Sequence, residues 1–397
     1  MTVEEKRARV EVLKNEIYKL KKEVDFNDAM QLAYKLVLNG SYGAFATQYF
    51  ILFNNQVAGT ITAEGRQLTK TMSRVNEDYW YNQWHLDTDT HQKLGITELG
   101  LKVEKIPESK SVSVYGDTDS IFVSFKPAMD SIENFEKLGL TPLEFIHKCD
   151  AVRTADFFKD ELDKHARSYG VENVEDFELE KISESIINIE KKKYIQNIVW
   201  EDGINYERLT YLKPTGVELV RSSTPLFARE KIPNVIKYIF SSPDTFNIKE
   251  LLKIIKDIRK EFELADIDSI SMQSSCNKYN EKVINDVERL EFVSGAHFAV
   301  KAAAHHNFLL HKNKEIQNKY ELIKSGDKIK YYYCTDMEKP VFGFKRGEFP
   351  IEFAPEVDYD TQFEKAILSP INSIIKPLDM PIISKRLSVV MDIFSGL

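Results

Sequence analysis

The chain has 397 residues, of which 43% are hydrophobic and 11% aromatic, and it carries a formal net charge of −8. This is the composition of an ordinary globular protein with enough apolar material for two or three domains. The negative charge gives no sign of a nucleic-acid partner, but it does not exclude one, because the local field decides where a polyanion binds.

The three cysteines, Cys149, Cys276 and Cys334, are far apart in the sequence. Their number and spacing exclude a disulfide framework and a CxxC metal site, which favours a reducing compartment. The charged start MTVEEKRARV lacks the apolar core of a signal peptide, and no run is apolar enough to span a bilayer. We therefore expect a cytoplasmic protein.

The first forty residues are predicted to be helical, because EEKRARVEVLKNEIYKLKKE mixes both charge signs with apolar residues at helical spacing. A second helix, DAMQLAYKLVLN, is expected to stop at the glycines of NGSYG. Residues 60–85 are predicted to be helical as well, and residues 110–125 to form a β-hairpin. A long helical tract then extends to about residue 170.

From about residue 178 the pattern changes to that of strands, in FELEKISESIINIEKKKYIQNIVW and INYERLTYL. Beyond SSTP, residues 222–225, helices dominate, with a polar and less regular stretch from about residue 312 to 350. This order predicts an α+β first half followed by a mostly helical part.

Asp117 and Asp119 lie within SVYGDTDSIFVSF, in which alternating apolar residues predict two strands. Gly116 and the polar residues after it are expected to form the turn. Residues two apart in an extended chain point the same way, so both carboxylates can face a Mg²⁺ ion, which prefers oxygen ligands. Two such ions about 4 Å apart can clamp the attacking and leaving oxygens of a phosphoryl transfer. A polar turn in water is the alternative for this motif alone.

Lys35, Asn39 and Tyr42 recur at i, i+4 and i+7 in YKLVLNGSYGAF, on one face of a helix. An ammonium group there suits a triphosphate, and an aromatic ring suits a base or base pair. Gly40 and Gly43 would let a nucleotide or another backbone come close. The alternative is an amphipathic helix end with a glycine stop.

A basic run with one aromatic residue forms the third motif. Lys191, Lys192 and Lys193 precede Tyr194 in a strand-like segment. In extended geometry Lys192 and Tyr194 would share one face, and Lys191 and Lys193 the other. This pattern suits a nucleic-acid backbone, and lysines on a solvated edge strand are the alternative.

Together the three motifs resemble the polymerase half of a family B DNA polymerase. KLVLNGSYG is similar to the family's fingers-helix motif, YGDTDS to its palm motif, and KKKY to the basic motif that grips the primer–template. ITAEGR, residues 61–66, is also similar to the family's segment that follows the fingers helix. YLKPTGVELVRSSTP, residues 211–225, is most similar to the T-even bacteriophage branch, in which a helical thumb with KPL near its end follows; here KPL is residues 376–378.

The resemblance implies a partial right-hand polymerase of the α+β class, with an antiparallel palm sheet and a mostly helical thumb. Its segments would be residues 1–45 as part of the fingers, 46–225 as the palm, 226–390 as the thumb and 391–397 as a clamp-binding tail. In that tail Met391, Ile393 and Phe394 would anchor the chain to a sliding clamp. A frayed terminal helix that returns to the thumb is the alternative.

The resemblance also implies a role for each site residue. Asp119 would be the principal ligand of two catalytic Mg²⁺ ions, with Asp117 beside it, and Lys35 would contact the incoming triphosphate. The nucleotide site would comprise Lys35, Asn39, Tyr42 and Gly43. The DNA contacts would comprise Lys191, Lys192, Tyr194, Lys213 and Arg221, of which Lys192 and Tyr194 would hold the primer terminus.

The chain has no segment similar to DxxSLYPS, which supplies the other metal-binding aspartate in this family, and no exonuclease motif. We therefore expect the C-terminal subunit of a split DNA-directed DNA polymerase, inactive without a partner chain that carries that aspartate and the exonuclease. A truncated reading frame is the alternative. Two other hypotheses are a catalytically inactive polymerase derivative that binds primer–template or clamp, and a DxD-type nucleotide-sugar transferase, which would leave NGSYG and KKKY unexplained.

Overall fold

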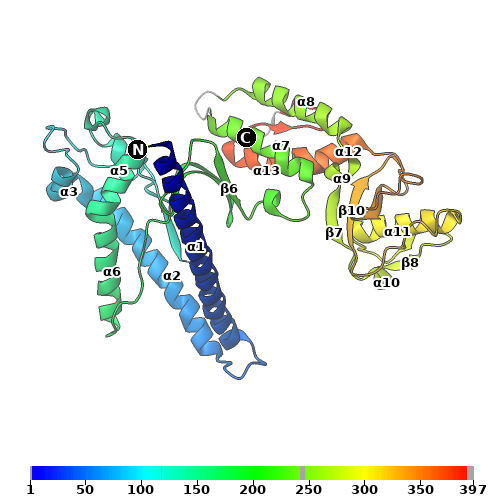
Figure 1. Ribbon diagram of the computed structural model, residues 1–397, viewed down its shortest axis with the longest axis horizontal. Helices are drawn as coiled ribbons and strands as arrows, with labels where there is room; N and C mark the ends of the chain where they lie inside the picture. Colours follow the sequence, from blue (N-terminus) through cyan, green and yellow to red (C-terminus); the bar gives the residue numbers. More distant parts are fainter. Residues whose placement is uncertain (1, 118, 242–245, 391–397) are drawn as a thin grey trace, which may run out of the picture. The chain divides into compact units, whose positions relative to one another are not determined.

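The computed structural model describes residues 2–117, 119–241 and 246–390 (Figure 1). The chain divides into two compact units, Met1–Glu178 and Leu179–Leu397. Helices and strands occur in both, and every strand pair among the described residues is antiparallel, which confirms the predicted α+β class. No helix within the described ranges is both long and apolar enough to cross a lipid bilayer.

The first unit is mostly helical and contains a single two-stranded β-ribbon among its described residues. Its helices are α1 (Val3–Ala46), α2 (Asn55–Asp78), α3 (Thr88–Lys93), α4 (Lys126–Asp130), α5 (Pro142–Cys149) and α6 (Ala155–Ser168). Its strands are β1 (Ser113–Asp117) and β2 (Ser120–Val123). Its short helical turns are η1 (Tyr79–Gln83), η2 (Trp84–Leu86), η3 (Phe135–Leu138) and η4 (Asp150–Thr154).

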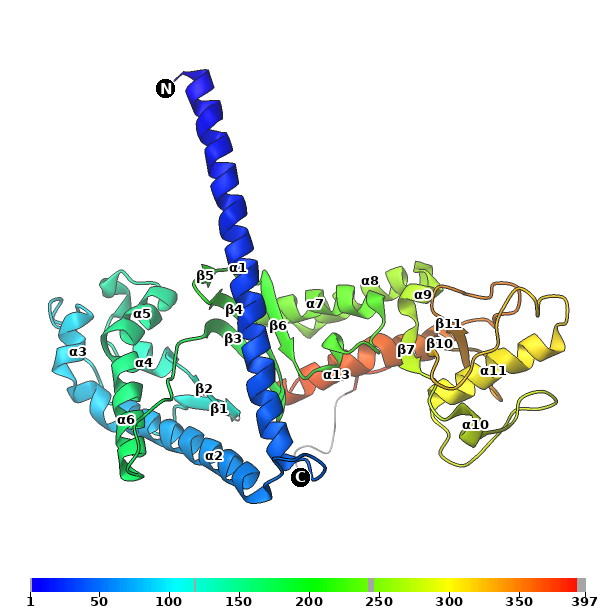
Figure 2. The same cartoon turned by 60° about the horizontal axis from the view of Figure 1, so that its bottom comes forward.

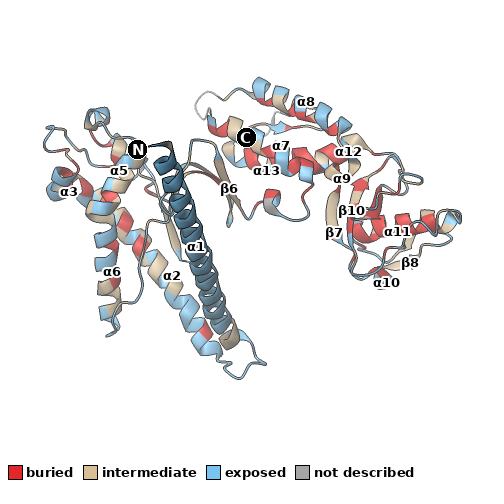
Figure 3. Ribbon diagram, in the orientation of Figure 1, coloured by how far each residue is buried: buried red, intermediate tan, exposed pale blue. Residues whose placement is uncertain are grey.

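Helix α1 is one continuous helix, so the prediction that a helix stops at NGSYG is wrong. A capping box begins it: the hydroxyl of Thr2 accepts from the amide of Glu5, whose carboxylate accepts from the amide of Thr2. The helix then continues through Gly40 and Gly43, because a glycine costs a helix only about 1 kcal/mol relative to alanine and does not break it. Figure 2 shows α1 as one long unbroken helix, and most of it is exposed (Figure 3).

The core of the first unit holds the ribbon in place. Met72 and Trp80 are buried, and the indole of Trp80 donates to the amide oxygen of Asn76 at 3.0 Å. The amide nitrogen of Asn76, itself only 2% exposed, donates to the hydroxyl of Ser113 in β1 at 3.2 Å. Helix α2 therefore contacts both strands of the ribbon and fixes the first of them by a partly buried hydrogen bond.

The described residues of the second unit form a four-stranded sheet, a three-stranded sheet and two two-stranded ribbons, together with helices. Its helices are α7 (Leu226–Ser241), α8 (Ile248–Leu264), α9 (Ile267–Ile270), α10 (Tyr279–Lys282), α11 (Phe298–Lys312), α12 (Tyr359–Phe363) and α13 (Ser369–Ile375). Its strands are β3 (Lys181–Glu190), β4 (Lys193–Glu201), β5 (Ile204–Asn205), β6 (Tyr211–Thr215), β7 (Met272–Ser275), β8 (Val283–Asn285), β9 (Glu291–Phe292), β10 (Lys328–Tyr333), β11 (Val341–Lys345), β12 (Ile382–Ile383) and β13 (Val389–Val390). Its short helical turns are η5 (Glu218–Val220), η6 (Glu364–Leu368) and η7 (Lys376–Leu378).

In the first sheet β4 is central and pairs with β3, β5 and β6. The second sheet has the order β11-β10-β7, and two of its strands lie within residues 312–350, where an irregular stretch was predicted. That prediction is wrong. The two strands are only six and five residues long, and polar segments surround them in sequence, but Tyr332, Phe342 and Phe344 are fully buried.

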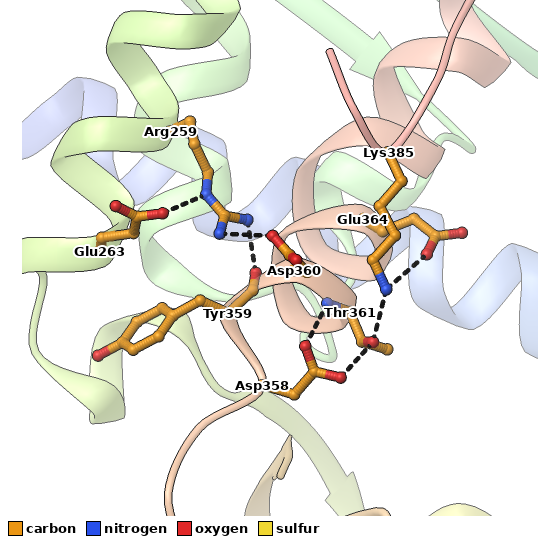
Figure 4. Close-up of polar contacts among 8 residues, drawn as sticks. All are labelled: Arg259, Glu263, Asp358, Tyr359, Asp360, Thr361, Glu364 and Lys385. Atoms are coloured by element: carbon orange, nitrogen blue, oxygen red, sulfur yellow. Dashed lines mark hydrogen bonds and ion pairs between the residues drawn. The ribbon is translucent and has the colours of Figure 1, made fainter. Parts of the chain in front are cut away.

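One polar network in the second unit ties α8 to α12 (Figure 4). The guanidinium of Arg259 donates to the backbone oxygen of Tyr359 at 2.6 Å, to Asp360 at 2.9 Å and to Glu263 at 2.7 Å. The same group lies 5.1 Å from the ring centroid of Phe363. Arg259 therefore joins two helices through bonds to backbone, carboxylate and aromatic ring at once.

Helix α11 packs closely on β11 through two buried histidines. The Nδ1 atoms of His305 and His306 lie 2.9 Å and 3.0 Å from the backbone oxygens of Val341 and Gly343. A Cβ atom on Gly343 would lie 3.0 Å from the backbone of Ala302, so a larger residue here would push the helix and the strand apart. Burial lowers the pKa of His306 to about 4, and Lys345 and His305 act in the same direction against two backbone acceptors that raise it.

We expect acid to destabilise the second unit through His306. The neutral ring is favoured in the folded chain, so stability is fully present above the ordinary histidine pKa of 6.5 and is lost as the pH falls from there towards 4. The loss attributable to this residue should reach about 2 kcal/mol by pH 5. Denaturant titrations at pH 7 and pH 5 measure it.

His306→Gln should lose much of this pH dependence, whereas the matched change at the half-buried His311, in the last turn of the same helix, should retain it. Equal pH dependence in the two variants would show that His306 is not responsible.

Candidate functional site

The face of α1 that carries Lys35, Asn39 and Tyr42 is present as predicted, since all three lie in one continuous helix and are exposed. Tyr42 is 40% exposed. A Cβ atom built on Gly40 or Gly43 would meet nothing within 4 Å. Nothing in the described part of this chain therefore requires glycine at either position, and the open space beside them is available to a ligand or to other polypeptide.

Asp117 and Asp119 lie at the tip of the β1–β2 ribbon, as predicted. Asp117 is the last residue of β1, is half-buried and pairs with Ser120, whose hydroxyl donates to the backbone oxygen of Asp117 at 3.3 Å. Asp119 is exposed in the turn, and residue 118 lies outside the described residues.

Two details of the hairpin prediction are wrong. Gly116 lies in β1, paired with Ile121, and Asp117 pairs with Ser120, so the strands extend further towards the loop than predicted. Asp119 is consequently a loop residue and not a strand residue. The argument that residues two apart in an extended chain face the same way therefore does not apply to this pair of carboxylates.

The described residues of the ribbon do not by themselves form a complete metal site. Among the residues that the structure describes, no group of three or more His, Cys, Asp or Glu side chains could hold a metal ion. Mg²⁺ commonly takes one or two protein carboxylates and fills its other positions with water and substrate phosphates. The exposed oxygens of Asp119, with Asp117 beside them, fit that partial role.

The basic motif forms a turn and not a strand. Lys191 and Lys192 connect β3 to β4, and Lys192 has a φ of +64°, in the left-handed region. The prediction that Lys192 and Tyr194 share a strand face is therefore wrong. Lys193 begins β4 and its ammonium lies 2.6 Å from Glu190 at the end of β3, an ion pair that lowers the pKa of that glutamate and closes the turn.

Gly216 sets the position of this turn, and sequence reasoning missed it. It follows β6, which pairs with β4, and has a φ of +65°. A Cβ atom at Gly216 would lie 2.0 Å from the backbone oxygen of Lys192, a distance that no real contact allows. A glycine directly after a strand was the available signal, but its contact with Lys192 is set by the pairing of β6 with β4.

The two predicted contacts with duplex backbone each lie beside a carboxylate. The ammonium of Lys213 is 2.5 Å from Glu201, which also pairs with Lys181 at 3.5 Å. Partial burial alone would lower the pKa of Lys213, but the hydrogen bond with Glu201 and the negative charges of Glu201 and Glu180 together outweigh it and raise that pKa. Arg221 lies 3.7 Å from Glu218. Their contact with DNA stays a prediction.

The predicted site residues therefore fall into separate groups. The helix face and the ribbon tip belong to the first unit, and the basic turn with Lys213 and Arg221 belongs to the second. Met391, Ile393 and Phe394 lie outside the described residues.

Comparison with known proteins identifies the class. The family model described as DNA polymerase family B matches residues 2–378. The chain belongs to DNA polymerase family B.

Viral polymerases are among its relatives. The chain is 26% identical over 370 residues to the DNA polymerase catalytic subunit of Human herpesvirus 7 (strain JI), an alignment that covers 88% of this chain and 32% of that protein. It is 28% identical over 215 residues to the DNA polymerase of Pyramimonas orientalis virus, covering 54% of this chain and 13% of that protein. The chain thus spans about a third or less of the length of these relatives.

Gly216→Ala should destabilise the second unit and displace the turn at Lys192. Alanine at a positive φ costs about 1–2 kcal/mol, and the overlap with a backbone oxygen adds a repacking cost, for a total of about 2–5 kcal/mol. Denaturant unfolding measures the loss.

Gly203→Ala is the matched control, because Gly203 has a φ of +84° but no atom within 4 Å of its Cβ position. It should show the conformational cost alone. Equal losses in the two variants would mean that the contact with Lys192 does not constrain this turn.

Proposed function

We propose that the exposed face of α1 and the tip of the β1–β2 ribbon form part of the active site of a DNA-directed DNA polymerase. This enzyme would transfer a nucleotide from a dNTP to a primer 3′-OH. The family match over residues 2–378 carries this proposal. The exposure of Lys35, Asn39, Tyr42 and Asp119 supports it, because a site that takes nucleotide and DNA must leave these groups accessible.

In the proposed reaction the primer 3′-oxygen attacks the α-phosphorus of the dNTP. The bond between that phosphorus and the oxygen bridging to the β-phosphate breaks, and pyrophosphate leaves. Asp119, with Asp117 beside it, would hold two Mg²⁺ ions, which as Lewis acids stabilise the attacking and leaving oxygens. The ammonium of Lys35 would offset charge on the triphosphate. The ring of Tyr42 would offer a flat face to the new base pair, beside the open backbone at Gly43.

The primer would be held from the second unit. The turn of Lys191 and Lys192 brings positive charge to the end of the β3–β4 hairpin, and Tyr194 follows directly in β4. Cationic and aromatic groups of this kind bind a sugar–phosphate backbone without reading its sequence. Lys213 and Arg221 would extend the contact along the duplex.

The proposal includes a partner polypeptide that supplies the DxxSLYP aspartate and the exonuclease, since the ribbon offers only two carboxylates. It also assigns residues 1–45 to the fingers, 46–225 to the palm and 226–390 to the thumb of a right-hand polymerase of the T-even phage type. Residues 391–397 would dock on a sliding clamp in the host cytoplasm. A catalytically inactive protein that only binds primer–template or clamp is the alternative.

Asp119→Asn tests the metal assignment. We expect the chain alone to extend no primer, and its mixture with a partner from the same genome that carries the DxxSLYP aspartate to extend it. Loss of a metal ligand should then reduce the rate of the mixture more than about 10³-fold, which is about 4 kcal/mol of transition-state stabilisation. Single-nucleotide extension at saturating Mg²⁺ measures this.

Glu108→Gln removes another exposed carboxylate of the first unit and should leave the rate unchanged. Full activity in Asp119→Asn would disprove the metal assignment. A mixture that binds primed DNA but never extends it would favour the inactive alternative.

Gly43→Ala tests the nucleotide site. Alanine favours a helix by about 1 kcal/mol over glycine, and its methyl group would meet nothing within 4 Å, so the variant should be at least as stable as the original chain. If the nucleotide occupies that space, its KM in the assembled polymerase should rise about tenfold or more.

Gly59→Ala in α2 is the control, because Gly59 is also a helix residue with open space at its Cβ position. It should share the effect on stability and leave KM unchanged. An unchanged KM in Gly43→Ala would remove Gly43 from the nucleotide site.

A further inference from the structure

Helix α8 carries four lysines in one row. Lys249, Lys253, Lys256 and Lys260 recur at i, i+4, i+7 and i+11, so they lie along a single face, and all four are exposed. We call this row the α8 lysine stripe. None of the motifs that identify the polymerase family includes it.

The opposite face of α8 fixes the helix to the core of the second unit. Leu251, Ile255, Ile258 and Phe262 are at most 4% exposed and belong to one core cluster with residues of α7 and α13. Because these residues lie half a turn from the stripe, the lysines point away from that core. Their exposure is thus set by the packing of the helix.

The acidic side chains of α8 do not neutralise the stripe. Each has a partner among the described residues, and only one of these partners is a stripe lysine. The pairs are Glu250 with the Tyr238 hydroxyl at 3.1 Å, Asp257 with Lys260 at 2.9 Å, Glu263 with Arg259 at 2.7 Å, and Glu261 with Lys231. Within the described ranges, Lys249, Lys253 and Lys256 have no ion pair closer than 4 Å.

The stripe is therefore a line of positive charge on a chain whose net charge is −8. It is about 17 Å long, from eleven residue steps of helical rise. Along the axis of a DNA duplex, where the rise is about 3.4 Å per base pair, that length corresponds to about five base-pair steps. A single row of ammonium groups at one-turn intervals can thus contact several successive phosphates.

The chemistry of the stripe favours nucleic acid over an acidic protein. The centres of protein–protein interfaces are rich in aromatic residues and arginine and poor in lysine. The stripe itself consists of lysines, the carboxylates beside it, Asp257 and Glu263, are paired with Lys260 and Arg259, and the large apolar neighbour is Leu264, at the end of the helix and 89% exposed. Phosphates accept lysine as a simple point charge, with no need for an apolar anchor.

We propose that the α8 lysine stripe binds the phosphate backbone of duplex DNA without sequence preference. The inference rests on the proposed polymerase function and adds a contact surface to that of the Lys192 turn. Its contribution is electrostatic, so it should weaken with salt, and it should be independent of nucleotide and of Mg²⁺ bound at Asp119.

The test uses the full chain with Lys249→Gln, Lys253→Gln and Lys256→Gln combined, and a fluorescent primed DNA duplex. Fluorescence anisotropy at several salt concentrations gives Kd and its salt dependence. We expect Kd at low salt to rise about tenfold or more, and the slope of log Kd against log salt to fall by about 2–3, since each lost phosphate contact removes about 0.9. The thermal unfolding midpoint should not change, because all three side chains are exposed.

The matched control is Lys102→Gln, Lys105→Gln and Lys137→Gln, three exposed lysines of the first unit that change the net charge equally. It should leave Kd and slope close to those of the original chain. Equal weakening in the two triple variants would overturn the proposal, because only total charge would then matter.

Unchanged duplex binding in the stripe variant would also overturn it, as would failure of the original chain to bind the duplex. Loss of binding to a polyglutamate probe with duplex binding retained would instead assign the stripe to an acidic protein. None of these results decides the polymerase function, which is tested separately by the extension rate of Asp119→Asn in the assembled enzyme.

Discussion

The position of the candidate metal ligands depends on one buried contact, the hold of α2 on the β1–β2 ribbon. Two strands alone are only marginally stable in water. Asn76 resolves this by using both ends of its amide: its oxygen accepts from the buried Trp80 indole and its nitrogen donates to Ser113 in β1. Any change that frees this amide leaves a buried polar group unpaired and removes support from Asp117, at the far end of the same strand, and from Asp119 in the loop that follows.

The second unit uses a different constraint for the same purpose. There the basic turn is fixed by the contact of one backbone with another, since Gly216 leaves room only for the carbonyl of Lys192. The ion pair between Lys193 and Glu190 closes the base of the turn. The total charge of −8 therefore conceals an ordered distribution, in which some lysines are neutralised by strand partners and others, as on α8, stand in rows away from the core.

Periodicity was sufficient to predict the elements that carry the site. The seven-residue spacing of Lys35, Asn39 and Tyr42 and the alternation around Asp117 both survive in the structure, because local geometry alone decides which residues share a helix face or a strand. The details that failed are those that tertiary contacts decide. The start of the hairpin loop depends on how Gly116 pairs with Ile121, and the left-handed turn at Lys192 depends on β6. The sequence shows the regular spacing of the α8 lysines. Only the folded chain shows that Glu261 and Glu263 pair with Lys231 and Arg259 and not with those lysines.

The openness of the candidate site constrains how it can work. Phosphoryl transfer relies on fixed charges in a setting from which bulk water is largely removed, because each charge is then worth far more than in water. Yet Asp119 is exposed, and the space beside Gly43 is open. Helix α1 also exposes large apolar side chains, among them Leu36 and Leu38 at 64% and 70%. In the proposed reaction, groups in this state would become catalytic only once nucleotide, DNA and further polypeptide cover them, so binding of these partners would complete the site as well as occupy it.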